Sequence, residues 1–243
     1  MNAMILDIET IPSQTLPDNC RPEFDESEVK LGNLKDRFKI EEKINAARAE
    51  WESKLDKQMS LDPDLCQICT VVIYDCHAGR VTASDFAEDE ESERRLLISV
   101  WNTIKYSFNN NIPIVTFNGK SFDIPVLLRR AMYLDVSVNP VVVDAMLERY
   151  DKQAHIDLMQ ILAFRNPFSG KPEAKSLNYY LNRFQLGSKG GMTGADVYPL
   201  FKEGKHQEIV DYCKNDVMQT ADLFKRVAPW LIKRSVLKEQ KAA

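Results

Sequence analysis

The stretch Met4–Thr10, with the sequence MILDIET, decides how the rest of the chain is interpreted. Read as a β-strand, it alternates so that Asp7 and Glu9 share one face while Leu6 and Ile8 share the other. Two adjacent carboxylates repel each other, and removing them from water costs free energy. Divalent cations that prefer oxygen ligands offset this cost. The pattern therefore indicates a cation site on the first strand of the fold.

The composition is that of an ordinary globular protein, with 243 residues, 44% of them apolar and 28% charged. This length allows a sizeable core, and no linker is evident, so we expect a single domain over 1–243. The net charge is −4. A passive nucleic-acid-binding module normally carries an excess of Lys and Arg, which disfavours that class. A nuclease is disfavoured much less, because bound metal ions supply positive charge at the scissile phosphate.

The five cysteines, an odd number, predict a reducing compartment rather than a disulfide framework. No apolar run approaches the roughly 20 residues that a membrane span requires. The N-terminus has no basic region followed by an apolar run, so we expect no signal peptide. These patterns predict a cytoplasmic protein with no membrane partner.

Hydrophobic periodicity and turn residues predict an α/β fold built on a mixed sheet. A hairpin is expected over 68–86, with its turn at Gly79. Beyond it, apolar strands alternate with helical patterns, which is typical of strands covered by helices on both faces. We expect strands at 112–117 and 141–143 and helices at 88–107, 122–133, 155–164, 175–183 and 206–227. The expected sheet has five to six strands and is flanked by helices.

Residues 13–65 form an insertion after the first strand. Its beginning, 13–27, is predicted to be an irregular loop, whereas 28–60 is rich in Lys and Glu and prone to form a helix. The interpretation of a solvated helix on the flank of the domain is favoured over a substrate-clamping or partner-binding arm. Apolar residues lie at loosely helical spacings that predict an amphipathic helix: Leu34, Phe38, Ile44, Trp51 and Leu55.

Asp123 is the third candidate acid. It follows the predicted strand 112–117 and lies just past the carboxyl end of that strand, where open α/β sheets place their ligands. For this residue alone, a helix cap provided by Ser121 or Asp123 is an equally good interpretation.

Asp216 is the fourth candidate acid, and it lies on the predicted helix 206–227. Tyr212 is four residues earlier, so a phenol and a carboxylate share one face of that helix. Ile209, Cys213 and Val217 form an adjacent apolar stripe. Taken alone, a surface helix with solvated acids is the simpler interpretation.

Together, these acids belong to three motifs in a fixed order. The motifs are Asp7-x-Glu9, Phe117-Asn118-Gly119-x-x-Phe122-Asp123-x-Pro125 and Tyr212-x-x-x-Asp216. Their order and spacing resemble the exonuclease motifs of the DEDD superfamily in its tyrosine-bearing branch. The chain is most similar to bacterial stand-alone proteins described as predicted 3′–5′ exonucleases related to the proofreading domain of family-B DNA polymerases. The resemblance covers about 1–12 and 66–228. The histidine-bearing branch has a His five residues before the last Asp, where this chain has Asp211.

The resemblance implies a ribonuclease H-like fold and assigns roles to residues. Asp7, Glu9, Asp123 and Asp216 would bind two Mg²⁺ or Mn²⁺ ions, and Tyr212 would orient or help deprotonate the attacking water. The chemistry agrees, because both ions prefer hard oxygen ligands, and two ions can promote hydrolysis without a nucleophilic side chain. The three histidines are too few and too scattered to suggest a zinc hydrolase.

Five further residues are candidates for substrate contact. Thr10 belongs to the first motif, and Asn118 and Phe122 could contact the terminal nucleotide, with Phe122 either stacking on a base or packing in the core. Asp157 belongs to a stretch that looks like the His-x-Asp-Leu element of polymerase-type exonucleases, although helix capping is its default interpretation. Lys189, in the glycine-rich stretch 186–194, could reach a phosphate or be simply solvated.

We therefore expect a metal-dependent 3′–5′ exonuclease that shortens single-stranded DNA from its 3′ end and releases nucleoside 5′-monophosphates. An exoribonuclease is the near alternative, since the same site hydrolyses either backbone. The alternative from another class is a catalytically silent nucleic-acid-binding module, against which the complete set of four acids and a tyrosine weighs.

Overall fold

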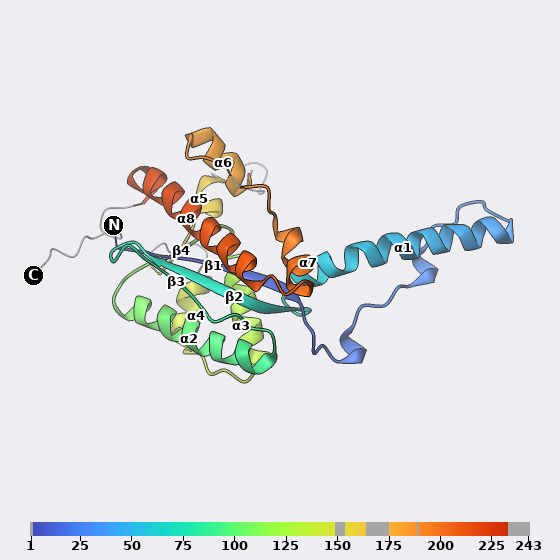
Figure 1. Cartoon of the computed structure of the whole chain (residues 1–243), viewed down its shortest axis with the longest axis horizontal. Coiled ribbons are helices and arrows are strands. Elements are labelled where there is room, and N and C mark those ends of the chain that lie inside the picture. The colour runs from blue at the N-terminus through green and yellow to red at the C-terminus, as the bar shows by residue number, and fades with distance from the viewer. Residues whose placement is uncertain (1, 149–153, 164–174, 189, 233–243) are drawn as a thin grey trace, which may run out of the picture.

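The computed structural model describes residues 2–148, 154–163, 175–188 and 190–232. Its sheet has five strands in the order β3-β2-β1-β4-β5 (Figure 1). Strand β2 is antiparallel to its two neighbours, β1 and β3, whereas β4 runs parallel to β1 and β5 runs parallel to β4. The sheet is therefore mixed, as predicted. The bounds of its strands are β1 Met4–Pro12, β2 Cys66–Asp75, β3 Arg80–Ala83, β4 Ile114–Thr116 and β5 His155–Asp157.

Helices cover both faces of this sheet (Figure 1). One face carries α2 Glu90–Asn109, α3 Asp123–Tyr133 and α4 Pro140–Leu147. The other face carries α5 Leu158–Leu162, α6 Leu177–Phe184 and α8 His206–Leu231. The remaining helices, α1 Arg37–Leu61 and α7 Val197–Lys202, lie at the end of the sheet where β1 ends. Short 3₁₀ turns are at Asp18–Cys20, Glu26–Glu28 and Gly194–Asp196.

The alternation of β1 divides its side chains between two cores. Leu6 and Ile8 belong to the core between the sheet and the α2, α3 and α4 layer. Ile5 faces the opposite core, under α8. Ile11 belongs to a third cluster, which includes Ile209 at the start of α8. Asp7 and Glu9 lie between Ile5 and Ile11 on the same face of β1, as the alternation of the strand predicted.

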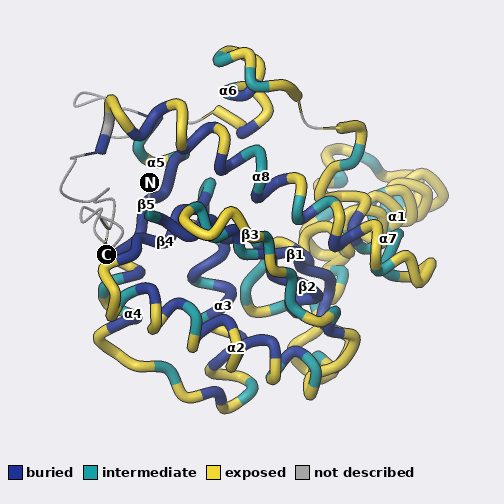
Figure 2. Tube along the Cα trace, turned by 60° about the vertical axis from the view of Figure 1, so that its left-hand side comes forward, coloured by how far each residue is buried: buried dark blue, intermediate teal, exposed yellow. Residues whose placement is uncertain are grey.

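Helix α1 is mostly exposed, and it projects from the rest of the chain (Figures 1 and 2). It has 25 residues, and only Met59 and Ser60 in its last turn are buried. Asp36 caps its start, because its side chain accepts hydrogen bonds from the backbone N–H groups of Phe38 and Lys39. The helix therefore begins later than the predicted residue 28. Phe38 is 77% exposed, so the amphipathic pattern predicted for the insertion does not bury this residue.

A buried ion pair joins α2 to α3. The Arg130 guanidinium donates to both carboxylate oxygens of Glu93 at 2.9 and 2.7 Å. The backbone N–H of Ile68 on β2 also donates to Glu93, at 2.8 Å. This network ties α3, which begins at Asp123, to α2 and to the sheet.

Two of the predicted elements are corrected by the structure, and one helix was missed. The predicted strand 141–143 is part of α4, because Asn139 caps the helix and Pro140 occupies its first turn, which are start signals that outweigh the β-branched valines. His155–Asp157 is not the start of a helix but strand β5, which pairs with β4. Helix α7 follows the glycine-rich stretch and was not predicted. The described sheet thus has five strands, the lower end of the predicted range.

Within the described residues, no helix combines the length and the apolar content that a membrane crossing requires.

Candidate active site

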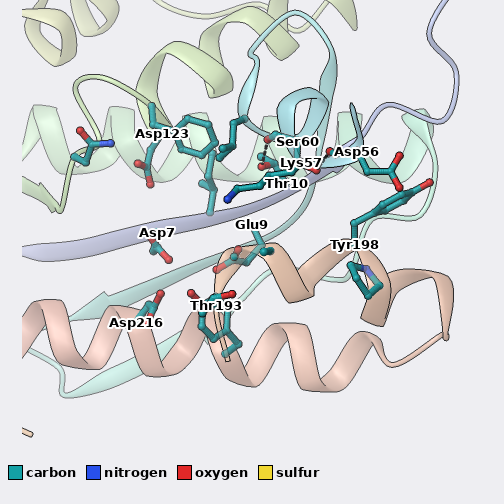
Figure 3. Close-up of a pocket in the computed structure, with 18 of the residues that line it drawn as sticks. Asp7, Glu9, Thr10, Asp56, Lys57, Ser60, Asp123, Thr193, Tyr198 and Asp216 are labelled. Atoms are coloured by element: carbon teal, nitrogen blue, oxygen red, sulfur yellow. Dashed lines mark hydrogen bonds between the residues drawn. The ribbon is translucent and has the colours of Figure 1, made fainter. Parts of the chain in front are cut away.

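A cleft of about 780 Å³ opens where β1 and β4 end (Figure 3). All four predicted acids and the predicted tyrosine line it, although they come from three elements of the chain. Thr10, Asn118 and Phe122 line it as well. The acids and the tyrosine in the cleft are Asp7, Glu9, Asp123, Tyr212 and Asp216.

Asp7 and Glu9 form the tightest acidic group of the cleft, together with Cys213 of α8. Ligand atoms of these three residues lie within 4.8 Å of one another, and the group could hold a metal ion. The Cys213 thiol lies 3.6 Å from the carbonyl oxygen of Asp7. Burial and the nearby acids raise the pKa of Cys213 well above its usual value, so the group stays a thiol. The carboxylate oxygens are therefore the ligands that the group offers to a hard cation.

Cys213 was not predicted as a residue of the site. The sequence placed it correctly on the apolar stripe of the helix, and it is fully buried there, as are Ile209 and Val217. Its proximity to Asp7 depends on how α8 crosses β1, which the periodicity of the helix does not reveal. Asp123 and Asp216 line the same cleft but lie outside this group of three.

Asp123 is placed by a tight turn between β4 and α3. Asn118 adopts a positive φ of 73°, and its carbonyl oxygen accepts the N–H groups of Ser121 and Phe122. Gly119 follows because an added Cβ would lie 2.3 Å from Oγ1 of Thr116. The residue before the helix is Phe122, and no side chain caps the helix start. The capping interpretation of Ser121 and Asp123 is therefore wrong.

The Asp123 carboxylate is costly to bury. It is 3% exposed, and its Oδ1 atom has no hydrogen-bond partner among the described residues. Burial is the main cause that raises its pKa to about 7, while the N–H groups of Asp123 and Ile8 oppose this shift. A buried acid with an unsatisfied oxygen in a cleft is typical of a binding or catalytic site.

Tyr212 and Asp216 lie one turn apart on α8, as predicted. The phenol hydroxyl donates a hydrogen bond to the Asp216 carboxylate. Burial raises the pKa of Tyr212, and the nearby carboxylates of Asp216, Glu9 and Asp7 raise it further. The phenol is therefore a proton-bearing donor, and the surface-helix interpretation of Asp216 is wrong, because this acid is only 6% exposed.

Comparison with known proteins identifies the family. The sequence pattern of the family described as "predicted 3′-5′ exonuclease related to the exonuclease domain of PolB" matches residues 60–240. The chain belongs to this family. The match includes Asp123, Tyr212 and Asp216, whereas Asp7 and Glu9 precede it. A search of curated proteins found no match.

The fold of this chain is similar to that of a solved polymerase structure. The family B DNA polymerase from the hyperthermophilic archaeon Pyrobaculum calidifontis superposes with a TM-score of 0.60 at 18% sequence identity. The similarity covers 97% of this chain and 26% of the polymerase, so this chain spans about a quarter of the length of the polymerase. The mixed sheet with helices on both faces is the ribonuclease H-like α/β fold that the sequence predicted.

Asp157 holds the turn that carries Asn118 into the cleft. Its carboxylate accepts the backbone N–H groups of Asn118 and Lys120, each at 3.0 Å. It also caps α5, because it accepts the N–H of Gln160 at 3.2 Å. The structure thus confirms the capping interpretation, and Asp157 does not line the cleft. Lys189 lies outside the described residues.

Phe122 lies between the cleft and the hydrophobic core. It lines the cleft and also packs, partly buried, against the core under α2 and α3. Asn118 reaches the same cleft from the turn that Asp157 holds. Both residues therefore line the cleft that contains the four acids.

The insertion supplies a wall of the cleft, which the sequence analysis did not predict. Residues of α1 line the cleft at helical spacings of three, four and seven, so one side of its last turns faces the acids. The flank interpretation is therefore incomplete, since only the beginning of α1 projects away. The lining residues of this wall are Ser53, Asp56, Lys57, Ser60 and Leu61. Thr193, Tyr198 and Lys202, in and before α7, line another part of the cleft.

Proposed function

We propose that the chain is a metal-dependent 3′–5′ exonuclease of the tyrosine-bearing DEDD branch, acting on single-stranded DNA. The observation that carries this proposal is the convergence of Asp7, Glu9, Asp123 and Asp216, with Tyr212, on one cleft. Segments about two hundred residues apart in the chain contribute these groups. Four carboxylates in one cleft repel one another, so a cationic partner would stabilise the arrangement.

The residues fit a pair of Mg²⁺ or Mn²⁺ ions. The donor set consists of hard carboxylate oxygens, and the buried Oδ1 atom of Asp123 has no protein partner among the described residues. Asp7 and Glu9 would hold ions from β1, Asp123 from the start of α3, and Asp216 from α8. When bound, such ions lower the pKa of a water and stabilise the leaving oxygen.

The protein groups have separate tasks in this hydrolysis. The oxygen of water forms a bond to the terminal phosphorus as the bond to the 3′-oxygen breaks, and the 3′-oxygen takes up a proton, so that a nucleoside 5′-monophosphate leaves. The protonated Tyr212 phenol orients the water or its hydrogen-bond network beside Asp216. The four carboxylates would hold the metal ions in fixed positions, and this would keep the attacking water and the leaving 3′-oxygen in line.

The shape of the cleft supports a single strand as the substrate. Its volume of about 780 Å³ is in the usual range of small-ligand sites, which suits a few nucleotides better than a duplex. Phe122 would stack on the last base, and Thr10 and Asn118 would contact the terminal nucleotide. We propose DNA over RNA, and one exonuclease domain over 1–243.

The decisive experiment uses 5′-labelled single strands of DNA and RNA with Mg²⁺ or Mn²⁺. The wild type should produce a ladder of strands shortened from the 3′ end, faster on DNA, and none with EDTA. Asp216→Asn should lower the rate at least about a hundredfold, because it removes a ligand. The matched control is Asp211→Asn, whose carboxylate is exposed on the same helix and pairs with Lys214. Binding without shortening would identify a silent module, and a faster reaction on RNA would identify an exoribonuclease.

A further inference from the structure

The last turns of α1 are fixed firmly beside the acids. Thr10 directly follows Glu9 in the first motif, and its hydroxyl donates to the carbonyl oxygen of Ser60 at 2.6 Å. Met59 and Ser60 are buried, and the N–H of Ser13 donates to the carbonyl oxygen of Leu65 at 2.8 Å. The C-terminal end of the insertion is therefore anchored to β1 next to the carboxylates, independently of the projecting start of α1.

Lys57 lies on this anchored part, one turn before Ser60. It lines the cleft, and Figure 3 shows its side chain reaching into the cleft on the side of Asp123. Among the described residues, Lys57 takes part in no recorded ion pair. Lys202 also lines the cleft, but its ammonium pairs with Asp56 at 3.4 Å and lies 4.4 Å from the ring centre of Tyr198.

The charges of the residues that line the cleft can be counted against those of two bound metal ions, a count that rests on the proposed function. Two divalent ions would neutralise the four carboxylates that bind them. Asp56 and Lys202 neutralise each other. Among the described residues that line the cleft, the remaining charge is the positive charge of Lys57. A phosphodiester link carries one negative charge. In a partly enclosed cleft, the attraction between the Lys57 ammonium and a phosphate is stronger than in open water.

We propose that Lys57 binds a backbone phosphate of the single strand near its 3′ end. The insertion thereby becomes part of the substrate-binding surface of this exonuclease. Lys57 precedes residues 60–240, so it lies outside the part of the chain that the family pattern matches. A contact of this kind is made with a phosphate and not with a base, so it should act equally on any sequence.

The test compares Lys57→Met with Lys54→Met. Methionine keeps the unbranched stem and the helix propensity, so the change removes mainly the charge. Lys54 is the matched control, because it pairs with Glu50 on the exposed surface of the same helix and does not line the cleft. Binding is measured by fluorescence anisotropy of a labelled strand whose 3′-terminal links are hydrolysis-resistant phosphorothioates, in Mg²⁺ at several salt concentrations. Degradation of the unmodified strand gives KM and kcat.

Lys57→Met should weaken binding of the resistant strand about tenfold and raise KM similarly with kcat nearly unchanged. The slope of log Kd against log salt should fall by about 0.7, the contribution of one phosphate contact with a single strand. Lys57→Arg should restore most of the affinity, and Lys54→Met should behave as the wild type.

If Lys57→Met binds the strand with the affinity and the salt slope of the wild type, this inference is overturned. The proposed function would still stand, provided that the wild type degrades the strand. Binding that depends on Lys57 without any degradation would support the contact and refute the proposed activity. A wild type that does not bind the strand would overturn both.

Discussion

Glu93 and Arg130 form a two-pronged ion pair whose side chains are 0% and 5% exposed. The pair joins α2 to α3, and the start of α3 carries Asp123 into the cleft. A backbone N–H of β2 completes the bonding of the same carboxylate. The position of one acid of the site thus depends on an ion pair buried between α2 and α3.

Glu93→Ala should lower the free energy of unfolding by about 3–5 kcal/mol, because it leaves the Arg130 charge buried and unpaired. Urea unfolding followed by circular dichroism measures this loss. Glu91→Ala is the control, since its pair with Arg95 is exposed and should be worth about 1 kcal/mol or less. Equal losses in the two variants would show that the buried pair does not hold α2 and α3 together.

The stability of the protein should fall as the pH decreases from 6.5 toward 4, through His155. Its Nδ1 donates to the carbonyl oxygen of Met146 at 2.9 Å, and its Nε2 accepts from the Thr116 hydroxyl at 2.8 Å. Burial is the main cause that lowers its pKa from 6.5 to about 4. Because the unfolded chain takes up a proton first, stability is fully present above the unfolded pKa and is lost between 6.5 and 4. The slope is at most about 1.4 kcal/mol per pH unit.

Urea unfolding at several pH values measures this slope, and His155→Gln should flatten it in that window. Carboxylates titrate in both proteins, so the difference between the two curves isolates the histidine. Parallel curves would contradict the predicted role of His155.

Asp157→Ala should lower stability by about 1–2 kcal/mol through the lost cap of α5 and should also raise KM for the strand. The second effect is expected because Asp157 holds the backbone of Asn118 and Lys120. Ser176→Ala provides the comparison, since Ser176 caps α6, accepts the N–H of Tyr179 and does not line the cleft. Ser176→Ala should reduce stability by a similar amount without changing KM. If KM changes equally in both variants, Asp157 acts only as a helix cap.

Asp123→Asn should make the metal-free protein more stable by about 1–3 kcal/mol above pH 7, because it removes a buried charge. The same change should reduce the increase in Tm that Mn²⁺ causes, since it removes a carboxylate ligand. Thermal unfolding with Mn²⁺ and with EDTA measures both effects. Asp211→Asn should leave both unchanged. A less stable metal-free variant, or a full response to Mn²⁺, would exclude Asp123 from the proposed metal site.

Several parts of the site could be predicted because they depend on short-range order. The period of two along β1 placed Asp7 and Glu9 on one face, and the period of the helix placed Tyr212 beside Asp216. The predictions near 141–143 and 155–157 failed for opposite reasons. Valine favours strands, but the Asn139-Pro140 start overrides it. His155–Asp157 is a strand because β4 offers it backbone partners.

Residue order was thus sufficient to predict the class of fold, whereas the four acids and the tyrosine were singled out because three motifs in a fixed order resemble a known family. The structure brings these five side chains to one cleft. Only the folded chain determined that Asp123 is not a cap, that Cys213 contacts Asp7, and that α1 forms a wall of the cleft. The physical reason is that a polar helix surface has the same pattern whether it faces bulk water or a water-filled cleft. Which of the two it faces is decided by anchors such as the bond from Thr10 to Ser60, between residues that lie fifty positions apart.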